Sequence, residues 1–261
     1  MKLNRLREML ASGKPTLSTR VNLCSPNIVE VLGLTGVFDY VEFLAEYGSF
    51  SLDGLENFCR AAELYHLGSM IKVDSEPRQF LAQRGLGAGF EGVLFADPRS
   101  PEDAAACVRL VKPETPQDGG LYGAANRRFA YVGQAGSAEY VEWLRGAVVA
   151  IMIEKRGAVD ALDELLATPG IDLIQWGGAD FSMSAGRPGE RRSPELKAVE
   201  RRVIEASLRA GIPARAEIHS ADEAKEYLDL GVRHFSLSSD LNLLFSGWKD
   251  GGEALRKAME E

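Results

Sequence analysis

The chain has 261 residues, enough for one α/β barrel, and its hydrophobic content of 45% is typical of a globular protein. A formal net charge of −8, with no run rich in Lys or Arg, argues against a nucleic-acid-binding surface. No apolar run approaches the roughly 18 residues of a membrane span, and the N-terminus lacks a signal-peptide pattern. Three scattered cysteines without metal spacing predict reduced thiols in a cytoplasmic protein.

Short apolar runs alternate with helical patterns along the whole chain. The expected helices cover residues 2–12, 27–34, 52–64, 77–84, 101–111, 138–145, 159–166 and 193–210, with further helices beginning at 220 and 240. The expected strands cover residues 16–23, 39–46, 69–73, 92–96, 148–154, 171–176, 213–219 and 234–238. Eight strands alternating with helices predict a parallel α/β fold, most simply a (β/α)8 TIM barrel that forms a single domain over residues 1–261.

Two carboxylates follow neighbouring strands of this pattern. Glu154 ends the run Val148-Val-Ala-Ile-Met-Ile, and Asp180 follows the run that begins at Ile171. Because parallel strands joined by a helix place their carboxyl ends on one edge of the sheet, both acids belong to the same site. Two carboxylates without a Cys or His partner suit a hard divalent cation, and the alternative is that both cap the following helices.

Charged and polar residues gather at the other strand ends as well. Active sites of such barrels lie at this face, although rim salt bridges and helix caps account for part of the set. The candidates in strand order are Arg20 and Asn22, Glu46 and Tyr47, Lys72 and Asp74, Asp97, Glu154, Asp180, Glu217 and His219, and Asp240.

The motifs at these strand ends resemble the HpcH/HpaI family of metal-dependent pyruvate aldolases, over nearly the whole chain. The matching segments are Met152-Ile-Glu154, Gly177-Gly-Ala-Asp180-Phe-Ser182, Gly36 with Phe38-Asp39-Tyr40, and Tyr227-Leu-Asp-Leu-Gly231. The resemblance implies that Glu154 and Asp180 hold Mg²⁺, Mn²⁺ or Co²⁺, and that the backbone amides of Gly178 and Ala179 bind the carboxylate of pyruvate. It also implies that Arg127 and Arg128, in the long loop 112–136, lie at the substrate entrance, unless that loop is simply solvated.

Three strand ends depart from the family pattern. The family has Asp-Gly-Glu-His after the second strand, where His and Asp act in proton transfer, whereas this chain has Leu44-Ala45-Glu46-Tyr47. Glu46 is retained, Lys72 replaces a family Arg, and Arg20 replaces a family Trp. These changes put the family's proton-transfer step in doubt for this chain.

Each replacement leaves alternatives open. Tyr47 is a candidate general acid or a packing residue, since a phenol titrates near pH 10. Lys72 is a candidate electrostatic partner of the enolate, and the alternative is a Schiff-base nucleophile. Arg20 is a candidate for binding the substrate carbonyl or carboxylate, or forms a rim salt bridge with Glu42 or Glu46.

The resemblance implies a metal-dependent carbon–carbon lyase that cleaves or forms 2-oxo acids, with a pyruvate-like acid and an aldehyde as partners. The alternatives are an oxaloacetate-type decarboxylase, which needs no base, and a catalytically weak barrel that binds metal and keto acid. The resemblance further implies a trimer or hexamer in which the C-terminal helix, residues 240–260, is exchanged between subunits. The apolar residues that follow the eighth strand agree with a helix that docks on another surface.

Overall fold

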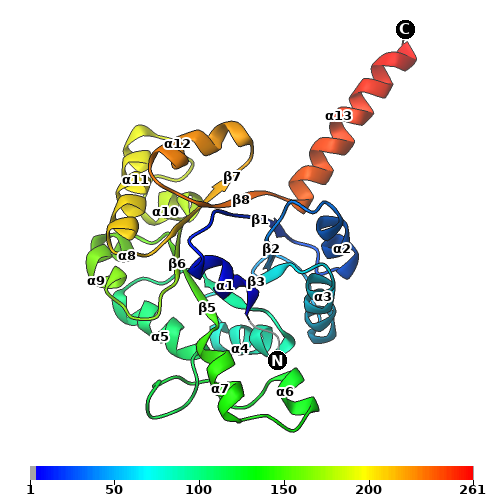
Figure 1. Cartoon of the computed structure of the whole chain (residues 1–261). Coiled ribbons are helices and arrows are strands. Elements are labelled where there is room, and N and C mark those ends of the chain that lie inside the picture. The colour runs from blue at the N-terminus through cyan, green and yellow to red at the C-terminus, as the bar shows by residue number, and fades with distance from the viewer. Residues whose placement is uncertain (1–3, 261) are drawn as a thin grey trace.

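A computed structural model describes residues 4–260, which form a closed barrel of eight parallel strands surrounded by helices (Figure 1). The strands pair in chain order, and β8 closes the barrel by pairing with β1. The strands are β1 (Thr16–Val21), β2 (Tyr40–Leu44), β3 (Gly68–Val73), β4 (Gly92–Phe95), β5 (Val148–Ile153), β6 (Leu173–Trp176), β7 (Ala214–Ile218) and β8 (His234–Ser239). The predicted TIM barrel is confirmed, with every strand end within two residues of the predicted one.

Helices cover the outside of the barrel between the strands. They are α1 (Arg5–Ala11), α2 (Pro26–Leu34), α3 (Leu52–Leu64), α4 (Arg78–Ala88), α5 (Pro101–Val111), α6 (Arg127–Tyr131), α7 (Ala138–Arg145), α8 (Arg156–Asp160), α9 (Leu162–Leu166), α10 (Gly178–Ser184), α11 (Pro194–Arg209), α12 (Ala224–Asp229) and α13 (Asp240–Glu260), with a 3-10 turn, η1 (Ala221–Glu223). The long segment 112–136, predicted as a loop, contains α6.

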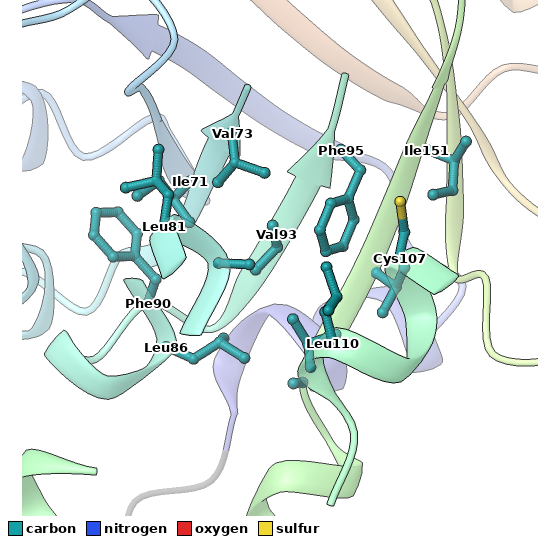
Figure 2. Packing of buried hydrophobic residues seen from close by; sticks show 14 of the residues in the cluster. Ile71, Val73, Leu81, Leu86, Phe90, Val93, Phe95, Cys107, Leu110 and Ile151 are labelled. Atoms are coloured by element: carbon teal, nitrogen blue, oxygen red, sulfur yellow. The ribbon is translucent and has the colours of Figure 1, made fainter. Parts of the chain in front are cut away.

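The main core lies between the barrel and its helices. In Figure 2 the side chains of Ile71, Val93 and Phe95 point outward from the strands toward Leu86 and Cys107 on the helices. All six residues of β3 and all six of β5 are buried. The sequence of β5 is accordingly a continuous apolar run, whereas β3 also contains Ser69 and Lys72. Burial on both faces holds each strand in a single register, so the strand ends are placed reproducibly.

The amino end of the barrel is plugged. Leu6 of α1 is fully buried and packs with Met70, Leu94 and Val148, which point into the barrel from three strands. The side chain of Asn4 caps α1 by accepting the N–H of Arg7 at 2.8 Å. Because this end is filled, the carboxyl ends of the strands form the accessible face.

The C-terminal helix α13 extends away from the barrel (Figure 1). Its apolar side chains are exposed, including Leu243 at 58%, Phe245 at 67% and Trp248 at 74%. Its first residue, Asp240, is buried and accepts the backbone N–H groups of Asn22 and Leu23. Among residues 4–260, no helix is both long and apolar enough to cross a bilayer.

Candidate active site

A cleft of about 520 Å³ opens at the carboxyl ends of the strands. It brings together eight of the ten residues for which the sequence predicts a catalytic, substrate-binding or metal-binding role, either in its lining or in direct contact with it. Those in the lining are Arg20, Tyr47, Lys72, Glu154, Gly178, Ala179 and Asp180, and Glu46 reaches Lys72 from just beyond β2. The site therefore lies where the sheet topology predicts it.

Glu154 stands directly after β5 and is only 2% exposed. Its Oε1 accepts the backbone N–H of Asp97 at 2.8 Å, and Asp97 adopts a left-handed φ of 67° to present that group. Burial raises the pKa of Glu154 to about 7, with further contributions from the negative charges of Asp180 and Asp97 and opposing ones from Lys72 and the Asp97 N–H. A buried carboxylate beside other carboxylates favours a bound cation.

Gly177 makes room for this carboxylate. A Cβ at that position would lie 2.3 Å from Oε2 of Glu154, so no other residue fits there without displacing the acid. Gly178 and Ala179 then begin α10, and the N–H groups in the first turn of a helix have no partner within it. Both residues line the cleft beside Asp180, and N–H groups at the start of a helix suit a carboxylate ligand.

Lys155 was not among the predicted site residues. Its Nζ lies 2.5 Å from Asp97 Oδ1 and 3.0 Å from Asp180 Oδ1, so an ammonium group bridges two carboxylates at the edge of the site. Its position directly after Glu154 was the available signal in the sequence. The positive charge of Lys155 therefore balances part of the negative charge of Asp97 and Asp180.

The donors present fit a divalent cation. In the described part of the chain, no group of three or more His, Cys, Asp or Glu residues could hold a metal alone. Mg²⁺ typically uses one or two carboxylates and completes its shell with water and substrate oxygens. Glu154 and Asp180 supply such a pair, and a chelating 2-oxo acid supplies further oxygens.

Lys72, on β3, is 5% exposed and forms an ion pair of 2.5 Å with Glu46. It also donates a hydrogen bond of 3.2 Å to the hydroxyl of Tyr47. Burial alone would lower the pKa of Lys72, but the hydrogen bond and charge of Glu46 outweigh it, and the pKa is raised well above its usual value. The amine is therefore protonated, whereas a Schiff-base nucleophile must be neutral. The structure favours the electrostatic role.

Tyr47 follows β2, with its hydroxyl at Lys72 and its ring 4.8 Å from the ammonium nitrogen. Burial raises the pKa of its hydroxyl, and the nearby charge of Lys72 only partly opposes this. The phenol is thus protonated at neutral pH. Such a group can donate a proton to a reaction intermediate but is a poor base.

Arg20 pairs with a residue other than the two expected. Its NH1 lies 2.6 Å from Glu217 Oε2, whereas Glu42 is bound by Arg215 and Glu46 by Lys72. The reason is directional: Arg20 extends across the end of β8 toward β7 instead of toward β2. The predicted salt bridge with Glu42 or Glu46 is wrong.

Arg127 and Arg128 do not reach the cleft of this chain. Arg127 donates to the carbonyl of Ala88, at the end of α4, and Arg128 forms an ion pair with Glu63 of α3. Their segment folds as α6, which lies beside the C-terminal ends of α3 and α4. The contacts with those helices hold both guanidinium groups away from the cleft. Neither side chain is placed to contact a substrate there.

Gln175, Arg215 and Tyr40, which form a buried polar chain with Glu217 below the cleft, were not among the predicted site residues. Gln175 links Glu217 to Arg215, and Arg215 binds Glu42 and the hydroxyl of Tyr40 inside the barrel. The signal was the alternation of charged residues 215 and 217 along β7, which places both side chains on the inner face.

Comparisons with known proteins agree with this architecture. A solved HpcH/HpaI aldolase/citrate lyase family protein from Burkholderia cenocepacia superimposes with a TM-score of 0.86 at 26% identity, covering 97% of this chain and 99% of that one. A hydroxypyruvate/pyruvate aldolase from Paraburkholderia phytofirmans is 27% identical, over 99% of this chain and 97% of the relative. A 4-hydroxy-2-oxo-heptane-1,7-dioate aldolase from Klebsiella pneumoniae is 25% identical, over 94% and 91%.

The barrel, the paired acids of its cleft and these relatives together define a carbon–carbon lyase of the aldolase type. Residues 53–246 match the family model described as HpcH/HpaI aldolase/citrate lyase, so the chain belongs to that family. Proteins of this family generally depend on a divalent metal.

Proposed function

We propose that the cleft binds a pyruvate-like 2-oxo acid on a divalent cation, Mg²⁺, Mn²⁺ or Co²⁺, held by Glu154 and Asp180. The N–H groups of Gly178 and Ala179 receive the carboxylate of the acid. The observation that carries this proposal is the pair of acids at the ends of β5 and β6, one of them buried, beside a protonated Lys72. The reaction makes or breaks the C3–C4 bond of the 2-oxo acid, in which C3 is the carbon that becomes the nucleophilic carbon of the enolate.

The bound cation supplies a Lewis acid that polarises the keto group. Lys72 places a fixed positive charge where negative charge develops on the enolate oxygen. Glu46 keeps Lys72 oriented through the ion pair of 2.5 Å. Tyr47, which donates as a phenol, delivers a proton to the enolate carbon to form the methyl group of pyruvate. Arg20 also lines the cleft, and we assign it to binding the second reaction partner.

A specific observation favours a second candidate, oxaloacetate-type decarboxylation. The end of β2 carries Leu44-Ala45-Glu46-Tyr47, without a histidine, and decarboxylation forms the same enolate without removing a hydroxyl proton. The third candidate is a barrel that binds metal and keto acid but turns over slowly.

One experiment separates the three candidates. The purified protein is incubated with Mg²⁺ or Mn²⁺ and either oxaloacetate or pyruvate plus a panel of aldehydes, and the products are followed by NMR. Aldol adducts support the lyase that acts on aldehydes. Pyruvate formed only from oxaloacetate supports the decarboxylase. Bound metal with neither product would exclude both enzyme proposals.

We also propose that the protein is a cytoplasmic homo-oligomer, a trimer or hexamer, in which α13 docks on a neighbouring subunit. The support is the row of exposed apolar residues on a helix that leaves its own barrel. Isolated helices of this kind gain most of their stability from packing. Sedimentation analysis of the full chain tests this, and a monomer would contradict it.

A further inference from the structure

Aldol cleavage needs a base that the residues assigned above do not provide. The hydroxyl proton of a 4-hydroxy-2-oxo acid must leave as the neighbouring carbon–carbon bond breaks. Tyr47 is protonated because burial raises the pKa of its hydroxyl. Glu46 is bound to Lys72 at 2.5 Å and does not line the cleft. Neither group is placed to accept that proton.

Two other carboxylates in the lining of the cleft are less accessible or lie on an exposed turn. The Glu200 side chain is only 11% exposed, and it is held by Lys197 at 2.8 Å and by the hydroxyl of Tyr227 at 2.8 Å. Glu223 lies on the exposed turn η1 and accepts the backbone N–H of His219 at 2.9 Å. Glu217, in contrast, projects from β7 within the barrel mouth and lines the cleft.

Glu217 is fixed from two sides and still has acceptor capacity. Its Oε2 accepts from Arg20 at 2.6 Å, and its Oε1 accepts from the amide of Gln175 at 2.5 Å. An ionised carboxylate has about four lone-pair sites, so each oxygen retains one for a substrate hydroxyl. The side chain is 28% exposed, so a ligand in the cleft can reach it.

Arg20 and Gln175, the two residues that hold Glu217, are themselves fixed by further hydrogen bonds. Arg20 Nε donates to the carbonyl of Ser238 at 3.1 Å, and Ser238 has a left-handed φ of 55° where the pairing of β1 with β8 is irregular. Gln175 accepts from Nε of the buried Arg215 at 2.6 Å. Backbone strain of this kind persists where the surroundings impose it, often at functional sites. The arrangement pre-orients one carboxylate toward the cleft.

We propose that Glu217 is the catalytic base for the substrate hydroxyl, an inference that rests on the proposed function. In cleavage, the O–H bond breaks and its proton passes to Glu217, while the O–H electron pair forms the aldehyde carbonyl. The electron pair of the C3–C4 bond moves into the enolate of the 2-oxo acid. Tyr47 then protonates C3, and solvent restores both side chains. In the synthetic direction, protonated Glu217 donates to the aldehyde oxygen.

The test compares two reactions of one variant. In Glu217→Gln, cleavage of 4-hydroxy-2-oxopentanoate should fall by about 10²–10⁴-fold, the usual contribution of a general base. Decarboxylation of oxaloacetate should stay near the wild-type rate, because that substrate has no hydroxyl proton to remove. Calorimetric binding of Mn²⁺ and of pyruvate should be unchanged. Glu226→Gln, a carboxylate on the rim of the same cleft, is the matched control and should retain both reactions.

A second variant separates a chemical role from a structural one. In Glu217→Ala, added formate should restore part of the cleavage rate and leave decarboxylation unaffected. Equal losses of both reactions together with weakened pyruvate binding would overturn the inference, as would unimpaired cleavage by Glu217→Gln. A wild-type protein that decarboxylates but never cleaves would also overturn it. A wild-type protein that binds Mn²⁺ and catalyses neither reaction would instead show that the proposed function itself is wrong.

Discussion

The ion pair inside the barrel allows a quantitative test of how the site is supported. Arg215 and Glu42 have fully buried side chains and bind one another, and Arg215 also contacts Gln175 at 2.6 Å and the Tyr40 hydroxyl at 3.2 Å. Arg215→Met removes the cation and leaves the Glu42 carboxylate buried without a counter-charge. Breaking such a pair costs about 3–5 kcal/mol.

That cost is a large share of the total stability. Folded domains are stable by about 5–15 kcal/mol, so the variant should remain folded but near its limit. For a chain of this size, each kcal/mol lowers the melting temperature by about 2–4 °C, so a decrease of about 6–20 °C is expected. Urea unfolding followed by circular dichroism measures the free energy directly.

The double variant Arg215→Met/Glu42→Leu tests the physical reason. Replacing both partners of a buried pair with apolar residues is often neutral or stabilising, so the double variant should recover most of the loss. In the double-mutant cycle of Arg215 and Glu42, the changes in the free energy of unfolding should therefore be strongly non-additive. Additive losses, or a single variant within about 1 kcal/mol of the wild type, would refute the idea that an uncompensated buried charge controls the effect.

The remaining predictions concern the site and its pH dependence. Glu154→Gln should abolish calorimetric Mn²⁺ binding and activity, and activity that survives both this change and EDTA would show that no metal is used. Tyr47→Phe should slow pyruvate methyl-proton exchange in D₂O with pyruvate affinity nearly intact, and an unchanged rate would assign Tyr47 to packing. Burial, then the charge of Arg215, lowers the pKa of His234 in the folded state, so the folded protein binds that proton more weakly than the unfolded chain. Stability should therefore decline as the pH falls below about 6.5, and His234→Gln should reduce that slope; identical slopes for the two proteins in urea titrations from pH 8 to 5 would contradict this.

Most of the fold could be predicted from local patterns in the sequence. The eight strands and the connecting helices follow from apolar runs and helical periodicity, which depend on neighbours a few residues apart. The clustering of Glu154, Asp180 and Lys72 could also be predicted from the sequence, because parallel topology alone brings strand ends together. Short elements were less predictable: α6 forms within a segment that looks like a loop, because its Phe129 is fully buried against distant residues.

Partners across the barrel could not be predicted from the chain. Arg20 and Glu217 are 197 residues apart, and their pairing depends on how far a side chain reaches across β8. The positions of Arg127 and Arg128 likewise depend on how α6 packs against α3 and α4. Spacing in the sequence contains no information on such contacts, because side-chain direction and strand register are set only when the barrel closes.

The sequence by itself therefore determined a TIM barrel, its acidic pair and the family to which its motifs point. The tertiary structure decided the charge states and partners around that pair: the protonated Lys72 beside Tyr47, the bridging Lys155, and the carboxylate of Glu217 fixed by Arg20 and Gln175. The physical reason is that fold class follows from local periodicity and burial. Proton affinity and hydrogen-bond geometry depend instead on desolvation and on charges brought together from distant strands.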